Sequence, residues 1–274
     1  MTVRIESDGK IATVMLDRPE RMNAINPEMS QQLDEFWSEF DRDDDLHVAI
    51  ITGAGRAFCA GRDLVRPDAH SDEIARAARS ADRSSRHSRS GGSPSNAAGL
   101  SSWGPDKTWK PVIAAINGWC LAGGFALALS CDLRIMSDAA RIGSMAPRRG
   151  LLPGGGQVQR LARYVPFGKA LELLLRANHL DAHEAHRIGL ANAVTSADDL
   201  LPTAREWAEE IASNAPLAVR ASKRAAYEGV LLQSGFAEGM TLESQLYSEI
   251  MVTEDAREGT TAFAEKRPAE FTGR

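Results

Sequence analysis

PVIAAINGWCLAGGFALALSCDLRI, residues 111–135, contains a strand, a tight turn, a helix and a second strand in close succession. The apolar run Val112–Ile116 predicts a buried strand, and Leu133–Met136 predicts another. Between them, Gly123 and Gly124 open an apolar helix, and such a turn directs backbone N–H groups into a cavity. The first helical turn carries no carboxylate, histidine or serine. The stretch therefore predicts an anion-binding backbone without an obvious acid or base beside it.

Strands and helices also alternate on the N-terminal side of this stretch. Val3–Glu6 and Ile11–Leu16 flank Asp8-Gly9, which is a strong hairpin signal. Pro27–Phe40 has apolar residues at helical spacing, and His47–Thr52 predicts a short buried strand. This alternation predicts an α/β fold of repeated β-β-α or β-α-β units around a buried sheet.

Helical patterns dominate from about Leu151 to the C-terminus. We predict an α/β core over residues 1–200, followed by a helical region over residues 201–274. The expected helices are Val158–Tyr164, Gly168–Leu175, Ala182–Ile188, Leu200–Ser213, Pro216–Leu232, Phe236–Met251 and Asp255–Lys266.

Residues 66–106 differ from the rest of the chain because they are rich in Ser, Arg, Gly and Ala. Their second half, residues 88–102, has a linker-like composition and is expected to be mobile. The first half carries arginines every three or four residues, which a helix would place on one face. That face has three readings: a solvated surface, a basic face beside a polyphosphate ligand, or a nucleic-acid contact. The arginines are Arg76, Arg79, Arg83, Arg86 and Arg89.

The composition is that of an ordinary soluble protein. The 274 residues are 43% hydrophobic and 25% charged, and the net charge of -5 gives no general attraction to nucleic acid or anionic membranes. No apolar run approaches the length of a membrane span, and the N-terminus has no secretory pattern. Cys59, Cys120 and Cys131 lack metal-binding or redox spacing, so we expect free, buried thiols and a cytoplasmic location.

Two turns can present backbone N–H groups to one anion. GRAFCAGRDL, residues 55–64, follows one predicted strand, and the turn at Gly123 follows another. Two such donors can hold a developing oxyanion, and each is typically worth roughly 3–4 kcal/mol in the transition state. Other anion-binding motifs do not fit: the chain has no GxGxxG, and LLPGGGQVQRL lacks the Lys-Ser/Thr of a phosphate loop.

The motifs RPERMNAI, AFCAGRDL, PVIAAINGWCLAGGFALALSCDLRI, GLLPGGGQVQRL and AFAEKRPAEF resemble those of the enoyl-CoA hydratase/isomerase (crotonase) family. The resemblance runs from about residue 3 to residue 271, with residues 66–106 atypical. It implies a spiral of β-β-α units with a C-terminal helical region that forms trimers or dimers of trimers. It also implies a coenzyme A thioester as substrate, with coenzyme A as part of that substrate and no separate cofactor.

The resemblance also assigns roles to individual positions. The oxyanion amides fall on Arg62 and Gly123. The residues that line the path of the coenzyme A adenine and pantetheine fall on Met22, Ala24, Ala60, Arg62 and Leu64. Lys266 is expected to reach the nucleotide end of the ligand from a neighbouring subunit.

The sequence departs from the family pattern at both catalytic carboxylates. Family hydratases carry one glutamate three residues after the oxyanion glycine and another three residues after the glycine of a later strand. Counting from Gly123 gives Ala126, and counting from Gly143 gives Ala146. A positioned acid or base typically contributes about 10²–10⁴-fold, so we expect inefficient hydration of enoyl thioesters.

Few residues could replace the missing carboxylates. Asp63 is a tentative acid or base, with a structural role as the alternative. Ser144, Arg148 and Arg149 lie on the loop of the second missing glutamate, and either arginine could pair with an acidic acyl group or form a surface ion pair. Trp119 and Cys120 are expected to line or pack the acyl pocket. The helically spaced His179, His183 and His186 lack acidic or cysteine partners, so we expect no metal site.

Three functions of different classes follow. The first is an enzyme that stabilises an enolate of a coenzyme A thioester, through isomerisation, slow hydration or reactions such as decarboxylation that need no base. The second is a non-catalytic acyl-CoA binding or shuttling protein, in which Ala126 and Ala146 enlarge an apolar pocket. The third is RNA binding through the arginine face of residues 76–89, which the acidic net charge disfavours.

Overall fold

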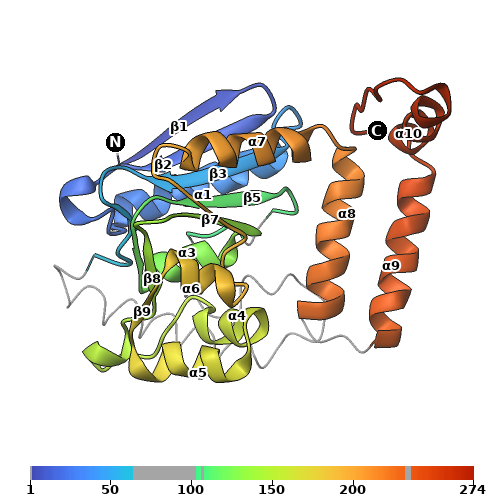
Figure 1. Ribbon diagram of the computed structural model, residues 1–274. Coiled ribbons are helices and arrows are strands. Elements are labelled where there is room, and N and C mark those ends of the chain that lie inside the picture. Colours follow the sequence, from blue (N-terminus) through green and yellow to red (C-terminus); the bar gives the residue numbers. More distant parts are fainter. Residues whose placement is uncertain (1, 64–102, 106–107, 232–235) are drawn as a thin grey trace.

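The computed structural model describes residues 2–63, 103–105, 108–231 and 236–274, which form two β-sheets with surrounding helices (Figure 1). The six-stranded sheet has the order β1-β2-β3-β5-β7-β10, and all its pairs are parallel except β1 with β2. Its strands are β1 (Val3–Asp8), β2 (Ile11–Leu16), β3 (Val48–Gly53), β5 (Val112–Ile116), β7 (Leu133–Ser137) and β10 (Ala193–Thr195). The four-stranded sheet has the order β4-β6-β8-β9 and contains β4 (Ala57–Cys59), β6 (Trp119–Leu121), β8 (Arg141–Gly143) and β9 (His179–Asp181).

From β3 to β8, consecutive strands alternate between the two sheets. The chain passes from β3 to β4, from β5 to β6 and from β7 to β8, each time leaving the larger sheet for the smaller one. A helix then returns the chain to the larger sheet after β6, which is the crossover that parallel strands require. The predicted α/β spiral of β-β-α units is confirmed.

Helices cover both faces of the larger sheet. Along β3, Val48 and Ile50 pack toward one side, while Ala49 and Ile51 pack toward the other, as the pleat of a strand dictates. The first side is covered by α7 (Leu200–Ala212), and the second by α1 (Pro27–Arg42) and α3 (Gly123–Ser130). The remaining helices are α4 (Gln157–Tyr164), α5 (Phe167–Arg176), α6 (Ala182–Arg187), α8 (Pro216–Ala226), α9 (Phe236–Met251) and α10 (Glu254–Glu265), with short turns η1 (Pro19–Arg21), η3 (Pro147–Arg149) and η4 (Tyr227–Leu231).

From Leu200 onward the described chain is helical, and the first of these helices belongs to the core. Helix α7 buries Leu200, Ala204 and Ala208 against the larger sheet. Figure 1 shows that α8 and α9 stand beside the sheets, with α10 following them. The part that projects from the core therefore starts at Pro216.

Several expectations fall on residues outside the described ranges. These are most of the 66–106 segment with its linker-like stretch, the arginine face from Arg76 to Arg89, and Leu64. Within the described ranges, every helix is too short or too polar to cross a membrane.

Candidate active site

Two backbone turns meet at the start of α3. A Cβ atom placed on Gly61 would lie 2.6 Å from the Gly123 nitrogen, and one placed on Gly123 would lie 3.3 Å from the Arg62 nitrogen. Gly61 also has a φ of +93°, which side chains rarely adopt. The structure therefore brings together the two amides that the sequence nominates, and it does so through glycines that allow backbone to touch backbone.

A short parallel bridge orients the Arg62 turn. The Ile25 N–H donates to the Gly61 carbonyl at 2.8 Å, and the Asp63 N–H donates to the Ile25 carbonyl at 2.9 Å. Because successive peptide groups of a strand point to opposite sides, the Arg62 N–H is turned away from Ile25. The Gly123 N–H is among the first amides of α3, which have no acceptor within their own helix.

Ala122 holds the second turn in an unusual conformation. Its φ of 50° and ψ of -117° lie outside the regions that residues with a side chain normally occupy. Its N–H donates to the Gly143 carbonyl at 3.1 Å, which ties the turn to the end of β8. Such strain persists only where the surrounding structure fixes it, and it is typical of functional sites.

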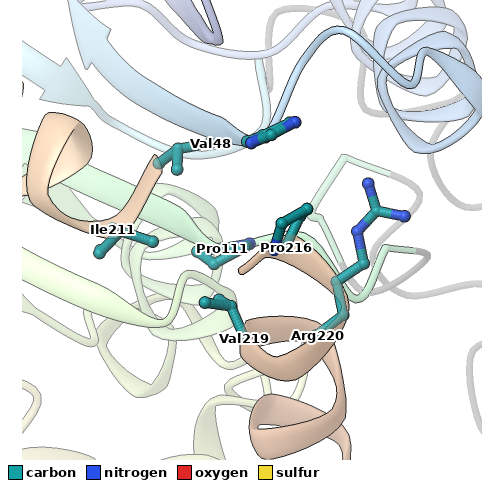
Figure 2. Close-up of a pocket in the computed structure, with 7 residues that line it drawn as sticks. Val48, Pro111, Ile211, Pro216, Val219 and Arg220 are labelled. Carbon is teal, nitrogen blue, oxygen red and sulfur yellow. The ribbon is translucent and has the colours of Figure 1, made fainter. Parts of the chain in front are cut away.

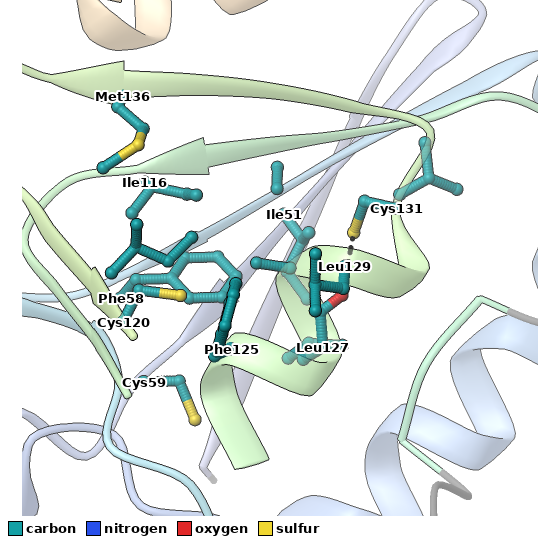
Figure 3. Packing of buried hydrophobic residues seen from close by; sticks show 14 of the residues in the cluster. Ile51, Phe58, Cys59, Ile116, Cys120, Phe125, Leu127, Leu129, Cys131 and Met136 are labelled. Atoms are coloured by element: carbon teal, nitrogen blue, oxygen red, sulfur yellow. Dashed lines mark hydrogen bonds between the residues drawn. The ribbon is translucent and has the colours of Figure 1, made fainter. Parts of the chain in front are cut away.

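Cys59 and Cys120 belong to the buried cluster of Figure 3, and each forms a hydrogen bond with one of the two turns. The Cys59 sulfur accepts the Gly61 N–H at 3.3 Å, and the Cys120 thiol donates to the Gly124 carbonyl at 3.4 Å. Burial raises the pKa of the Cys59 thiol to about 12 and raises the pKa of the Cys120 thiol well above its usual value. Both thiols are therefore neutral at physiological pH, and they position the backbone rather than act as nucleophiles.

Asp63 lies next to the Arg62 turn, but its carboxylate is engaged by arginines. Arg18 donates to one carboxylate oxygen at 3.0 Å, and Arg21 approaches the other at 3.4 Å. The Arg18 guanidinium also donates to the Ala24 carbonyl. This geometry joins the 18–25 loop to the 60–63 loop and favours the structural alternative for Asp63.

The two positions at which the family resemblance predicts glutamates, Ala126 and Ala146, lie on α3 and on the loop after β8. Ala126 lies three residues after Gly123, on the same face of α3, and its side chain is buried. The loop after Gly143 carries Ser144, which is fully buried, and Ala146, which precedes η3. The Ser144 hydroxyl has no hydrogen-bond partner among the described residues.

The arginines of η3 differ from Ser144 because they are exposed. Arg149 donates to the Met145 carbonyl at 3.3 Å, and the neighbouring Arg148 is also at the surface. Both predicted roles, recognition of an acidic acyl group and a surface ion pair, stay predictions.

The residues nominated for the coenzyme A path adjoin Arg62. The Ala60 N–H donates to the Met22 carbonyl at 3.0 Å, and Ala24 precedes the residue that bridges to Arg62. Met22 and Ala24 are partly buried, in a loop where Met22 has a left-handed φ of 51°. Lys266 lies at the end of α10, exposed to solvent, and α10 lies apart from α3 in Figure 1.

Trp119 and the three histidines lie near the smaller sheet. The Trp119 ring packs edge-on against His179 at 5.2 Å, on the face of β6 opposite to Cys120. His183 is exposed on α6, and His186 Nδ1 lies 3.1 Å from the Ala191 carbonyl. Within the described ranges, no three His, Cys, Asp or Glu side chains are grouped to hold a metal ion.

Trp103 is a residue of the site that the sequence analysis did not single out. Its indole Cζ3 atom would lie 2.8 Å from a Cβ atom on Gly123, and the Arg62 guanidinium lies 5.3 Å from its ring centre. Trp103 lies near the end of the atypical 66–106 segment, where neither periodicity nor a motif links it to Gly123. An isolated tryptophan in a segment of small and polar residues was the one available signal.

A cavity at the junction of α7 and α8 lies elsewhere in the molecule (Figure 2). It has a volume of about 10 Å³, which holds a single water molecule, and its walls include Ile211, Pro216 and Arg220. Its size and place separate it from the turns at Gly61 and Gly123.

Comparisons of the sequence and of the fold with known proteins identify the same family. Residues 106–274 match a sequence model of the enoyl-CoA hydratase/isomerase family, and residues 11–89 match a second model of the same description. The short-chain-enoyl-CoA hydratase of Clostridium acetobutylicum is 37% identical over 269 residues, which cover 98% of this chain and 96% of that protein. The carnitinyl-CoA dehydratase of Proteus mirabilis is 39% identical over 277 residues, which cover 100% of this chain and 99% of that protein.

The fold agrees with these relatives. The crystal structure of enoyl-CoA hydratase from Bacillus anthracis superposes with a TM-score of 0.85 at 30% identity, and the match covers 100% of both chains. The crotonase fold is therefore confirmed, and the chain belongs to the enoyl-CoA hydratase/isomerase family, whose members act on coenzyme A thioesters.

Proposed function

We propose that this protein binds an acyl- or enoyl-CoA thioester and stabilises an enolate-type oxyanion with the backbone amides of Arg62 and Gly123. The observation that supports this proposal is the contact between the two turns, in which Gly61 and Gly123 pack backbone against backbone. An oxyanion site needs two donors fixed before the ligand arrives. The Ile25 bridge, the strained Ala122 and the two buried thiols supply that rigidity.

The proposed path of coenzyme A follows the two loops that Asp63 joins. Met22, Ala24 and Ala60 lie along this junction, next to Arg62. Leu64 continues the path in the sequence but lies outside the described residues. Lys266 follows the last turn of α10, which lies apart from α3 in Figure 1. A contact of Lys266 with the nucleotide end of the ligand would therefore come from a second copy of the chain.

We further propose that efficient hydration is lost because Ala126 and Ala146 supply no acid or base. Asp63 is a poor replacement, since Arg18 and Arg21 stabilise its carboxylate in place. Chemistry that needs the oxyanion site alone remains open, such as isomerisation or decarboxylation of a malonyl-type thioester, in which departing CO₂ leaves the enolate. The alternative is a non-catalytic acyl-CoA binding protein with an apolar pocket at Ala126 and Ala146.

The test is the loss of enoyl-thioester ultraviolet absorbance with crotonyl-CoA. We expect slow or no turnover by the wild-type protein and a large gain in the Ala126→Glu/Ala146→Glu double variant, since each carboxylate is worth about 10²–10⁴-fold. Rapid turnover by the wild-type protein would contradict the proposed loss of hydration. An inactive double variant that also fails to bind crotonyl-CoA would contradict the oxyanion site.

We also propose that the protein assembles as a trimer or a dimer of trimers through its C-terminal helices. Large apolar side chains of α9, α10 and their connection are exposed, with Phe263 87% and Val252 71% accessible. Exposed apolar groups of this kind mark surfaces that another protein covers. Light scattering should give three or six times the monomer mass, and Phe263→Asp should lower it.

A further inference from the structure

Trp103 has a fixed backbone position between α1 and the candidate active site. Its carbonyl accepts a hydrogen bond from the indole N–H of Trp37 at 2.8 Å, and the Trp37 side chain is fully buried on α1. The Trp103 side chain is itself only 7% exposed. A buried carbonyl with a buried donor resists displacement, because breaking the bond would leave both groups unsatisfied.

The indole ring lies against Gly123 of the second turn and beside the side chain of Arg62. Its Cζ3 atom lies close enough to Gly123 that an added Cβ would be 2.8 Å away, which is inside any normal contact distance. The Arg62 guanidinium lies 5.3 Å from the ring centre, within the range of a cation–π interaction. The edge of the ring therefore forms a wall beside Gly123, at the point where a Cβ on Gly123 would also lie 3.3 Å from the Arg62 nitrogen.

We propose that Trp103 is a specificity-determining residue that limits the acyl group beside the thioester carbonyl. This inference rests on the proposed function, because a thioester carbonyl oxygen held by the Arg62 and Gly123 amides brings the carbonyl carbon, and the C2 carbon bonded to it, beside Gly123 and the indole edge. A branch at C2 then meets the indole edge. The protein should accordingly prefer acyl groups that are unbranched at C2.

A purely structural role for Trp103 predicts something different. Removal of a core side chain lowers stability and weakens all ligands alike, whereas removal of a pocket wall changes the ratio between ligands. The ratio of dissociation constants for a branched and an unbranched thioester is therefore the quantity that separates the two roles.

The experiment measures the Kd of crotonyl-CoA and of 2-methylcrotonyl-CoA by calorimetry for the wild type, Trp103→Ala and Trp103→Phe. One methyl group in a closed pocket discriminates by about tenfold or more, so the wild type should prefer crotonyl-CoA by about that factor. The ratio should approach one in Trp103→Ala and fall in between in Trp103→Phe, which covers the case in which the alanine variant does not fold. Trp109→Ala is the matched control, because Trp109 is more exposed and packs against Tyr227 instead.

Two results would overturn the inference. A wild-type protein that binds both thioesters equally, or folded Trp103 variants that keep the wild-type ratio, would remove Trp103 from specificity and leave the oxyanion proposal intact. A wild-type protein that binds neither crotonyl-CoA nor its methyl derivative would overturn both proposals.

Discussion

At the scale of single residues, glycines determine how closely the turns that carry Arg62 and Gly123 approach. Gly61 and Gly124 face backbone atoms, and Gly123 faces the Trp103 ring, at distances that leave no room for a methyl group. The tightest of these contacts is at Gly124, where a Cβ would lie 2.1 Å from the Cys59 carbonyl oxygen. The separation between α3 and β4 is therefore set by the absence of a side chain.

Gly124→Ala should destabilise the protein by about 3 kcal/mol, because the added methyl meets backbone that cannot rotate away. Urea unfolding followed by circular dichroism measures this change. Gly168→Ala is the control, since Gly168 lies in α5 with open space around its Cβ position. We expect this control to be stabilising by about 0.5–1 kcal/mol. Equal unfolding midpoints for the two variants would contradict the close packing at Gly124.

At the scale of elements, one carboxylate joins the projecting helix α8 to the core. Asp132 accepts hydrogen bonds from the Val112 N–H at 2.7 Å, from the Lys223 ammonium at 2.8 Å and from the Tyr227 hydroxyl at 2.9 Å. Lys223 also donates to the Lys110 carbonyl at 2.9 Å. Asp132 thus fixes the start of β5 and the C-terminal end of α8 to the same point, just before β7.

Asp132→Asn should lower the free energy of unfolding by about 3 kcal/mol, because it leaves the largely buried Lys223 without its anionic partner. Tyr227→Phe removes one hydrogen bond and should cost about 1 kcal/mol. Limited proteolysis should cleave near α8 faster in Asp132→Asn than in Tyr227→Phe. If the two substitutions lowered the free energy of unfolding equally, the Lys223–Asp132 ion pair would contribute no more than the Tyr227 hydrogen bond.

The long elements could be predicted from the sequence, because their patterns span several turns or a full apolar run. The helix at Pro27 carries five buried apolar residues at helical spacing, and the hairpin at Asp8-Gly9 pairs as expected. Among the strands of the smaller sheet, only the one at Gly143 was expected, and that from the family resemblance. Each has three residues, as in Trp119–Leu121, which is too short to show a period of two.

The residues of the candidate site could likewise be predicted only in part. The amides of Arg62 and Gly123 follow from motifs, whereas Trp103 and the Asp63 ion pairs depend on contacts between residues far apart in the sequence. Cys59 and Cys120 were expected as buried thiols, but their hydrogen bonds to the two turns depend on the backbone conformation of residues two and four positions further along the chain. The sequence pattern of these short segments does not specify that conformation.

At the scale of the whole molecule, basic residues surround a histidine at the junction of the sheet with α7 and α8. His47 adjoins the small cavity of Figure 2, and its buried Nδ1 has no partner among the described residues. Burial is the main cause that lowers the pKa of His47 below 6.5, and the charges of Lys10, Arg220 and Lys110 add to it. A hydrogen bond with the Ala212 backbone acts in the opposite direction and raises the pKa of His47.

The free energy of unfolding should therefore rise with pH up to about 6.5, because in this window the unfolded state binds the His47 proton more readily than the folded state does. The stabilisation that comes from neutral His47 is fully present above pH 6.5 and is lost as the pH falls through the lowered pKa of His47. Urea unfolding at pH 5 and pH 7 should show a smaller difference in His47→Gln than in the wild type. His183→Gln, at an exposed histidine of α6, should leave the difference unchanged. An identical difference in all three proteins would contradict this assignment.

The order of strands also determines how the protein can be built during translation. In both sheets, every strand pairs with the strand of that sheet that precedes it in the chain, so no strand has to insert between two that are already paired. A nascent chain can therefore extend each sheet at its growing edge as residues leave the ribosome. Helix α7, which covers one face of the larger sheet, follows every strand of that sheet in the chain and emerges well after Gly53 ends β3. At about 5–20 residues per second, that apolar face stays uncovered for on the order of ten seconds, during which exposed apolar surface is prone to aggregate.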